Sequence, residues 1–156
     1  MQTSNSTQSR RVLVVGATGG TGRATVQRLR DLGHSVTAFS RSADRLAAEI
    51  DGIVTINGDA ADPIAVERAV QNQDAVIVTL GITENPLRVR FFGPARTPLD
   101  VRSRGTRNVL AAMRKHGVRR LIVRSSFGVG ATRALLGFVD RLLFALLLKP
   151  QIQDTE

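Results

Sequence analysis

Residues 11–22 read Arg-Val-Leu-Val-Val-Gly-Ala-Thr-Gly-Gly-Thr-Gly, a short apolar run that passes directly into a cluster of glycines. A continuous β-branched run of this length is typical of a strand that is buried on both faces of a parallel sheet. The residues that follow predict a helix over 20–32, because Val26, Leu29 and Leu32 recur at helical spacing and Gly33 ends the pattern. The segment therefore predicts a strand, a glycine turn and a helix in direct succession.

The same alternation continues along the chain. The sequence predicts further strands over 35–40, 53–57, 75–79 and 121–125, and further helices over 43–50, 63–70 and 99–116. Residues 82–98 hold three of the five prolines and show no clear period, so they predict a long loop. Alternating strands and helices favour right-handed crossovers and a parallel sheet. We therefore expect a doubly wound α/β domain, with about five strands and helices on both faces of the sheet.

Within the glycine cluster, Gly16, Gly19 and Gly22 have a G-x-x-G-x-x-G spacing. Between a buried strand and a helix, this spacing indicates a site for the pyrophosphate of a dinucleotide. The first glycine allows a sharp turn, the second lets a phosphate approach the backbone, and the third lets the helix pack close to the sheet. The amides and the dipole of the helix start attract the phosphates. The alternative is a tight turn that needs glycine for its geometry alone. A P-loop is excluded because no Lys-Ser/Thr pair follows.

The end of the second predicted strand indicates which dinucleotide binds. An NAD site has an acidic residue there, about 20 residues after the glycines, which binds the ribose 2′-hydroxyl. This chain has Arg41 between two serines, and Arg45 one helical turn further. The planar guanidinium of an arginine suits the 2′-phosphate of NADPH. The sequence therefore favours NADP(H) over NAD(H), with a solvated surface arginine as the alternative.

Two more strand ends carry residues of interest. Asp59 follows the third predicted strand, at the edge where open parallel sheets bind ligands, and its carboxylate can accept from an adenine amino group. Asp62 directly precedes Pro63 and is better explained as a helix N-cap. Gly81 follows the fourth predicted strand, where the missing side chain would let a cofactor lie against the backbone.

The composition excludes several kinds of catalytic and metal site. The 156 residues include no cysteine, which excludes disulfides, thiolate nucleophiles and Cys-ligated metals, and no metal site is predicted. Tyrosine and tryptophan are also absent, so a phenolic acid is excluded. The formal charge is +9, but the basic residues are spread along the chain without interleaved aromatics, so binding of nucleic acid is not favoured.

The two ends of the chain carry separate expectations. Residues 1–10 are polar and predict a disordered leader before one domain over 11–156. No targeting segment is visible, and the apolar tract over 134–148 falls short of the roughly 20 residues of a membrane span, so a cytoplasmic protein is expected. Residues 131–148 predict a helix with a leucine stripe, and we expect homo-oligomers to form through the stripe from Leu135 to Leu148.

The chain resembles the atypical short-chain dehydrogenase/reductase families through five motifs that occur in the families' order: GATGGTG at 16–22, SRSADRL at 40–46, GDAAD at 58–62, VTLG at 78–81, and GTRNVLAAMRKHGVRRLIVRSS at 105–126. It is most similar to NAD(P)H-binding proteins of the flavin reductase/biliverdin reductase B type and to their NmrA-like relatives. The likeness covers residues 11–130 and implies a Rossmann-like fold.

The resemblance implies a set of cofactor contacts. The pyrophosphate would be held by Gly16, Thr18, Gly19, Gly20, Thr21 and Gly22. The 2′-phosphate would be held by Arg41 and Arg45. The adenine would contact Asp59 and Ala60, and the nicotinamide side would be lined by Leu80 and Gly81. Ser125 and Ser126 match the fifth-strand position of a catalytic serine. Ser126 is the catalytic candidate and Ser125 a further cofactor contact, with a hydroxyl-capped strand end as the alternative.

Two departures from the family shape the functional prediction. The chain lacks the Tyr-x-x-x-Lys pair of typical short-chain dehydrogenases, as do the flavin reductase-like families. The resemblance therefore implies hydride transfer from NADPH to a flavin, a quinone or a similar conjugated acceptor. Relatives of this type also continue past the position of Glu156, so a domain that is incomplete at its C-terminus is expected. The alternative function is a redox-sensing NmrA-like module that holds a dinucleotide without turning it over.

Overall fold

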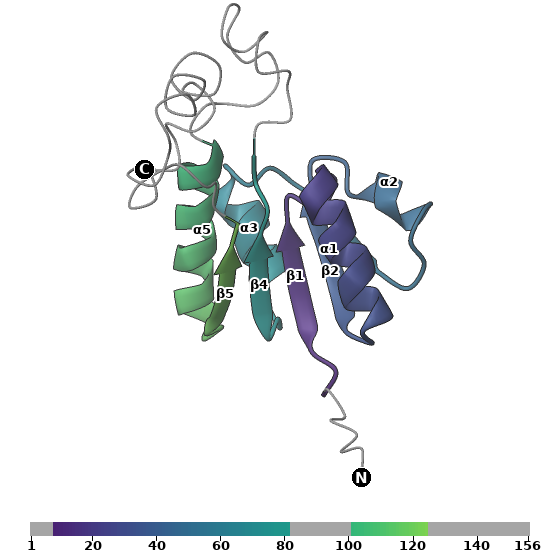
Figure 1. The fold of residues 1–156 in the computed structure, drawn as a ribbon. Helices are drawn as coiled ribbons and strands as arrows, with labels where there is room; N and C mark the ends of the chain where they lie inside the picture. The colour runs from purple at the N-terminus through teal and green to yellow at the C-terminus, as the bar shows by residue number, and fades with distance from the viewer. Residues whose placement is uncertain (1–7, 82–100, 125–156) are drawn as a thin grey trace, which may run out of the picture.

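In the computed structural model, which describes residues 8–81 and 101–124, strands and helices alternate along the chain (Figure 1). The strands are β1 (Arg11–Val15), β2 (Ser35–Ser40), β3 (Val54–Asn57), β4 (Ala75–Val78) and β5 (Arg120–Val123). The helices are α1 (Gly20–Asp31), α2 (Asp44–Ala47), α3 (Pro63–Val70) and α5 (Val101–His116). The predicted alternation is confirmed.

The strands form one five-stranded sheet in the order β3-β2-β1-β4-β5. Every neighbouring pair is parallel, so all carboxyl ends lie at one edge, as the arrowheads in Figure 1 show. β1 is central, with Val15 paired to Phe39 of β2 on one side and to Val78 of β4 on the other. The order reverses at β1, which is where sheets of this kind bind their ligands. The predicted doubly wound Rossmann-like fold is confirmed.

The sheet has a hydrophobic core on each face. On one face, Val14 of β1 packs in a cluster with Val26 of α1 and Leu46 of α2. On the other face, Leu13 and Val15 pack with residues of α3 and α5. Successive side chains of a strand point to opposite faces, so β1 needs an apolar residue at every position from 12 to 15. The continuous apolar run of the sequence has this physical cause.

The second helix differs from the prediction. It spans Asp44–Ala47, whereas the sequence predicted a helix over 43–50. The side chain of Ile50 is 5% exposed and packs in the α1 face of the core. Gly52 then takes a φ of +75°. The chain must turn between the buried Ile50 and the start of β3, and this turn ends the helix early.

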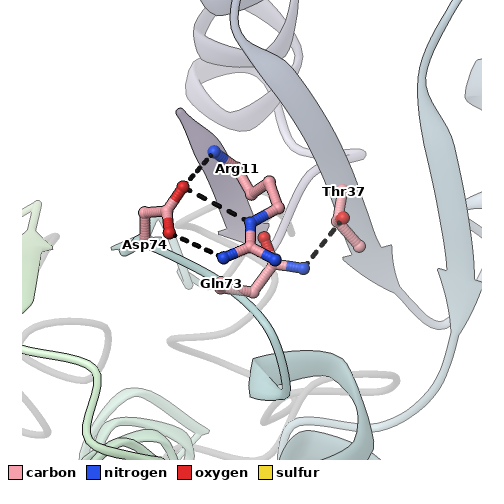
Figure 2. A network of polar contacts seen from close by, with 4 residues as sticks. All are labelled: Arg11, Thr37, Gln73 and Asp74. Carbon is pink, nitrogen blue, oxygen red and sulfur yellow. Dashed lines mark hydrogen bonds and ion pairs between the residues drawn. The ribbon is translucent and has the colours of Figure 1, made fainter. Parts of the chain in front are cut away.

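An ion pair joins the amino end of β1 to the residue that precedes β4 (Figure 2). The Asp74 carboxylate accepts from the Arg11 amide at 2.8 Å and from the Arg11 Nη2 at 2.9 Å. Beside this pair, the Gln73 Nε2 donates to the Thr37 Oγ1 at 3.2 Å. These contacts hold β1, β2 and β4 together at the edge of the sheet opposite to the carboxyl ends.

The Arg11–Asp74 pair predicts how stability depends on pH. Hydrogen bonds from Arg11 lower the pKa of Asp74 from 3.8 to about 2. The stabilisation is therefore complete above the unfolded-state pKa and is lost as the pH falls through the folded-state value. We expect Asp74→Asn to lower the free energy of unfolding at neutral pH and to flatten its decline between pH 4 and pH 2, measured by urea unfolding. Asp51→Asn, outside this network, is the control. Identical pH profiles for Asp74→Asn and the parent would contradict the prediction.

Candidate functional site

The carboxyl edge of the sheet brings most of the predicted site residues together. The glycine turn follows β1, Arg41 follows β2, Asp59 and Ala60 follow β3, and Leu80 and Gly81 follow β4. The turn after β1 contacts β2, because the Gly16 and Ala17 amides donate to the Phe39 carbonyl at 2.9 and 3.2 Å. The predicted loops therefore lie along one edge, around the point where the strand order reverses.

The β1–α1 turn needs glycine at its first and last positions. Gly16 has a φ of +86°, which L side chains rarely adopt, and a Cβ there would lie 3.1 Å from the Leu80 amide nitrogen. A Cβ on Gly22 would lie 2.2 Å from the Gly16 carbonyl oxygen. Gly16 thus lets the turn approach the end of β4, and Gly22 lets α1 start directly against the turn. The geometry at Gly16 agrees with the sharp turn predicted for the first glycine, whereas the nearest atoms to a Cβ on Gly22 belong to the turn and not to a strand of the sheet.

The start of α1 fits an anionic group. The N-cap residue is Gly19, which provides no side-chain cap, and the first turn contains no acidic residue. The first amides of a helix have no partner within the helix, and the helix dipole adds positive potential at this end. A Cβ on Gly20 would meet nothing within 4 Å, so there is open space beside these amides. The turn can therefore take a phosphate group.

Thr79 joins this turn to β4 through a contact that the sequence analysis did not find. Its buried hydroxyl donates to the Val15 carbonyl at 2.9 Å and lies 3.2 Å from the Gly16 carbonyl. The Thr79 amide also donates to the Val15 carbonyl, at 2.8 Å. A threonine directly after an apolar strand is a weak signal in sequence, because threonine is common in strands for other reasons.

We expect Thr79→Val to lower the free energy of unfolding by about 1 kcal/mol, the net value of a typical buried hydrogen bond. Valine has a similar shape, so packing is retained while the hydroxyl donor is lost. Thr79→Ser, which keeps the hydroxyl, is the matched control. Chemical unfolding monitored by circular dichroism measures both. Equal stability of Thr79→Val and the parent would show that this hydroxyl is not needed to hold the turn.

The end of β2 places its two arginines on the surface. Arg41 directly follows the strand and is exposed, and Arg45 is exposed on α2. The first acidic residue after β2 is Asp44, whose amide donates to the Asn57 side chain at 3.1 Å. This bond fixes the start of α2 to the end of β3. Arg41 thus directly follows β2, where the sequence analysis expects an acidic side chain in an NAD site.

The two aspartates after β3, Asp59 and Asp62, make different contacts. The Asp62 side chain accepts from the Ile64 amide at 2.9 Å and caps α3, which confirms the predicted N-cap. The Asp59 Oδ1 accepts from the Ala61 amide at 2.9 Å, and the residue is exposed. Between them, Ala60 is buried. Asp59 therefore presents its carboxylate at the carboxyl edge, while Asp62 serves the fold.

Three residues of α5 contact the loops after β3 and β4, and the sequence analysis named none of them as site residues. Arg102 bonds to the Leu80 carbonyl, Gly105 packs against Leu80 and Ala60, and Asn108 bonds to the Ala60 carbonyl. The signal that was available is their spacing of three residues, which places them on one side of a helix.

Several predictions fall outside the described residues. They are residues 1–7 of the predicted leader, the loop over 82–98, Ser125 and Ser126, and the helix over 131–148 with its leucine stripe. None of the helices in the described ranges is long and apolar enough to cross a membrane. The same ranges contain no group of three or more His, Asp or Glu residues that could hold a metal ion.

The family of this chain follows from comparison with known proteins. A family model described as NAD(P)H-binding matches residues 16–154. The chain belongs to this NAD(P)H-binding family, which indicates a nicotinamide dinucleotide as its cofactor. The family predicted from the five motifs is thereby confirmed.

The relatives include reductases. The 2-alkyl-3-oxoalkanoate reductase of Stenotrophomonas maltophilia is 36% identical over 116 residues, which is 74% of this chain and 33% of the relative. The 3-diazoavenalumate denitrifying reductase of a Streptomyces species is 38% identical over 118 residues, which is 74% of this chain and 37% of the relative. The chain thus spans about a third of the length of these curated relatives.

Among solved structures, the chain is similar to ChuY, an anaerobilin reductase from Escherichia coli. The TM-score is 0.69 at 23% identity, and the match covers 93% of this chain and 63% of ChuY. This likeness confirms the fold.

Proposed function

We propose that this chain carries the cofactor site of an NADPH-dependent oxidoreductase that reduces a conjugated acceptor such as a flavin or a quinone. The observation that carries the proposal is the glycine turn at the start of α1, beside β4, with an open and uncapped helix terminus. The reductases among the relatives support the reaction class. When bound, NADPH would supply the hydride.

The residues of the chain would bind and orient the cofactor. The pyrophosphate would lie on the amides of the β1–α1 turn, with the hydroxyls of Thr18 and Thr21 nearby. Asp59 and Ala60 would contact the adenine, and Leu80 and Gly81 would lie on the nicotinamide side. Because these loops end neighbouring parallel strands, a dinucleotide can extend along the carboxyl edge from β3 to β4.

The preference for NADPH rests on the end of β2. Arg41 and Arg45 would pair with the 2′-phosphate, since a guanidinium donates two parallel hydrogen bonds to phosphate oxygens. The exposed position of both residues supports this role, because a ligand can reach them without rearrangement of the core.

The test is to add the purified protein to NADPH and record the nicotinamide fluorescence, then to supply free flavin and quinone acceptors. We expect a blue shift on binding and oxidation of NADPH when an acceptor is present. Tighter binding of NADH than of NADPH would overturn the cofactor preference. Failure to bind either dinucleotide would overturn the proposed function.

The absence of tyrosine from the sequence favours a second candidate, a redox sensor that binds a dinucleotide without turnover. Such a module needs no proton donor. Tight binding of NADP⁺ together with no oxidation of NADPH across a panel of acceptors would select it. Oxidation of NADPH with any acceptor at a rate that depends on the protein would exclude it.

A further inference from the structure

We propose that Arg102, Gly105 and Asn108, here called the α5 clamp, are positioning residues that hold the two cofactor loops at a fixed separation. One loop is Asp59–Ala60 after β3 and the other is Leu80–Gly81 after β4. The proposal rests on the proposed function, in which the first loop contacts the adenine and the second lies on the nicotinamide side.

Arg102, at the amino end of α5, holds the loop after β4. Arg102 lies in the first turn of α5, and its Nε donates to the Leu80 carbonyl at 3.2 Å. The Arg102 Nη2 lies 3.3 Å from the point where a Cβ on Gly81 would stand. The guanidinium therefore packs against the Gly81 backbone. Together with the bond to Leu80, this contact holds the loop after β4 in place relative to α5.

Asn108, near the middle of α5, holds the loop after β3. The Asn108 Nδ2 donates to the Ala60 carbonyl at 2.8 Å, in a partly buried position. Ala60 itself is buried, and Asn108 provides its carbonyl with a donor from the protein. The hydrogen bond sets where the Asp59–Ala60 backbone stands relative to α5.

Gly105 lets both loops reach the helix together. A Cβ at this position would lie 2.4 Å from the Leu80 Cδ1 and 3.1 Å from the Ala60 Cβ. Because Gly105 has no side chain, the side chains of Leu80 and Ala60 both pack directly against the backbone of α5 at this position. Arg102 and Asn108 are separated by about 9 Å along the axis, at 1.5 Å per residue. A rigid helix therefore sets the distance between the two loops.

The two hydrogen bonds of the clamp are distinct from the apolar contacts that dock α5 on the sheet, to which Gly105 contributes through Ala60 and Leu80. Further apolar contacts come from the buried side chains of Val109, Ala112 and Met113, which pack in the core with α3 and β4. Arg102 and Asn108 bond instead to backbone carbonyls of loops at the carboxyl edge. Their loss should therefore affect the loops while the helix stays in place.

The experiment measures the binding of NADP⁺ and of 2′,5′-ADP, which contains only the adenine half, by calorimetry. Asn108→Ala should weaken both ligands by about five- to tenfold, the value of one lost hydrogen bond. Arg102→Met should weaken NADP⁺ by a similar factor and leave 2′,5′-ADP within about twofold. Arg104→Met, an exposed arginine of the same helix, is the control for the lost charge. If Asn108→Ala does not fold, Asn108→Ser, which is too short to reach Ala60, replaces it.

Amide hydrogen exchange of the ligand-free protein provides the second readout. Asn108→Ala should speed exchange at the Ala61 and Asp62 amides, and Arg102→Met at the Leu80 and Gly81 amides. Equal loss of both ligands in both variants, with faster exchange throughout, would overturn the proposal in favour of general destabilisation. Unchanged binding and exchange would also overturn it. If the parent binds neither ligand, the proposed function fails, and the local exchange pattern alone decides whether the clamp exists.

Discussion

Gly22→Ala should lower the free energy of unfolding by about 3 kcal/mol or more, and should abolish binding of NADPH. The added Cβ would lie 2.2 Å from the Gly16 carbonyl oxygen and 2.9 Å from the Ala17 Cα. Both are backbone atoms, so neither can move aside by a change of rotamer. The β1–α1 turn must open, and with it the contacts of α1 with the sheet. Urea unfolding and fluorescence titration with NADPH measure the two effects.

Gly20→Ala is the matched control for this prediction. It lies in the same turn of α1, but an added Cβ meets nothing within 4 Å. Because alanine also favours the helix more than glycine does, the variant should be at least as stable as the parent. If Gly22→Ala unfolds at the same urea concentration as Gly20→Ala, the inference that Gly22 is packed too closely to accept a side chain is wrong.

Arg41→Ala should weaken the binding of NADPH by about 1.5–3 kcal/mol, the value of hydrogen bonds to a charged group, and should leave NADH unaffected. NADH has a hydroxyl where NADPH has the 2′-phosphate, so only NADPH loses an ionic partner. Titration of both cofactors against both proteins at one salt concentration measures the difference.

Arg28→Ala is the control for Arg41→Ala, because it removes an exposed arginine from the last turn of α1, at the opposite edge of the sheet. It should leave both cofactors unaffected. A loss of NADPH affinity in Arg28→Ala as large as that in Arg41→Ala would mean that the arginines act only through net charge.

The arrangement of the strands could be predicted because local patterns determine it. The run from Val12 to Val15 is apolar at every position and is followed by glycine, which is typical of a strand covered on both faces. The helix stop at Gly33 is equally local, since its φ of +80° favours glycine. The exception is α2, where the burial of Ile50 and the turn at Gly52 outweigh the helix-forming residues between them.

The predicted cofactor loops likewise followed from a simple rule, because carboxyl ends of parallel strands must lie at one edge. The contacts between the loops could not be predicted in the same way. The hydroxyl of Thr79 and the amide of Asn108 find their partners 64 and 48 positions away. Such pairs depend on how neighbouring elements pack, and a single sequence carries no periodic signal for them.

The central position of β1 has a consequence for how the chain folds. Its neighbour β2 follows after one helix, but Thr79, which ties the other side of the glycine turn, lies 64 positions from Val15. Closing a longer loop costs more chain entropy, and non-local pairing slows folding. The β1–α1–β2 unit is therefore favoured to assemble first, and β4 docks later. During synthesis on the ribosome, the β1–α1 turn lacks its contact with Thr79 until residue 79 has emerged, so we expect the turn of the nascent chain to reach its final conformation late.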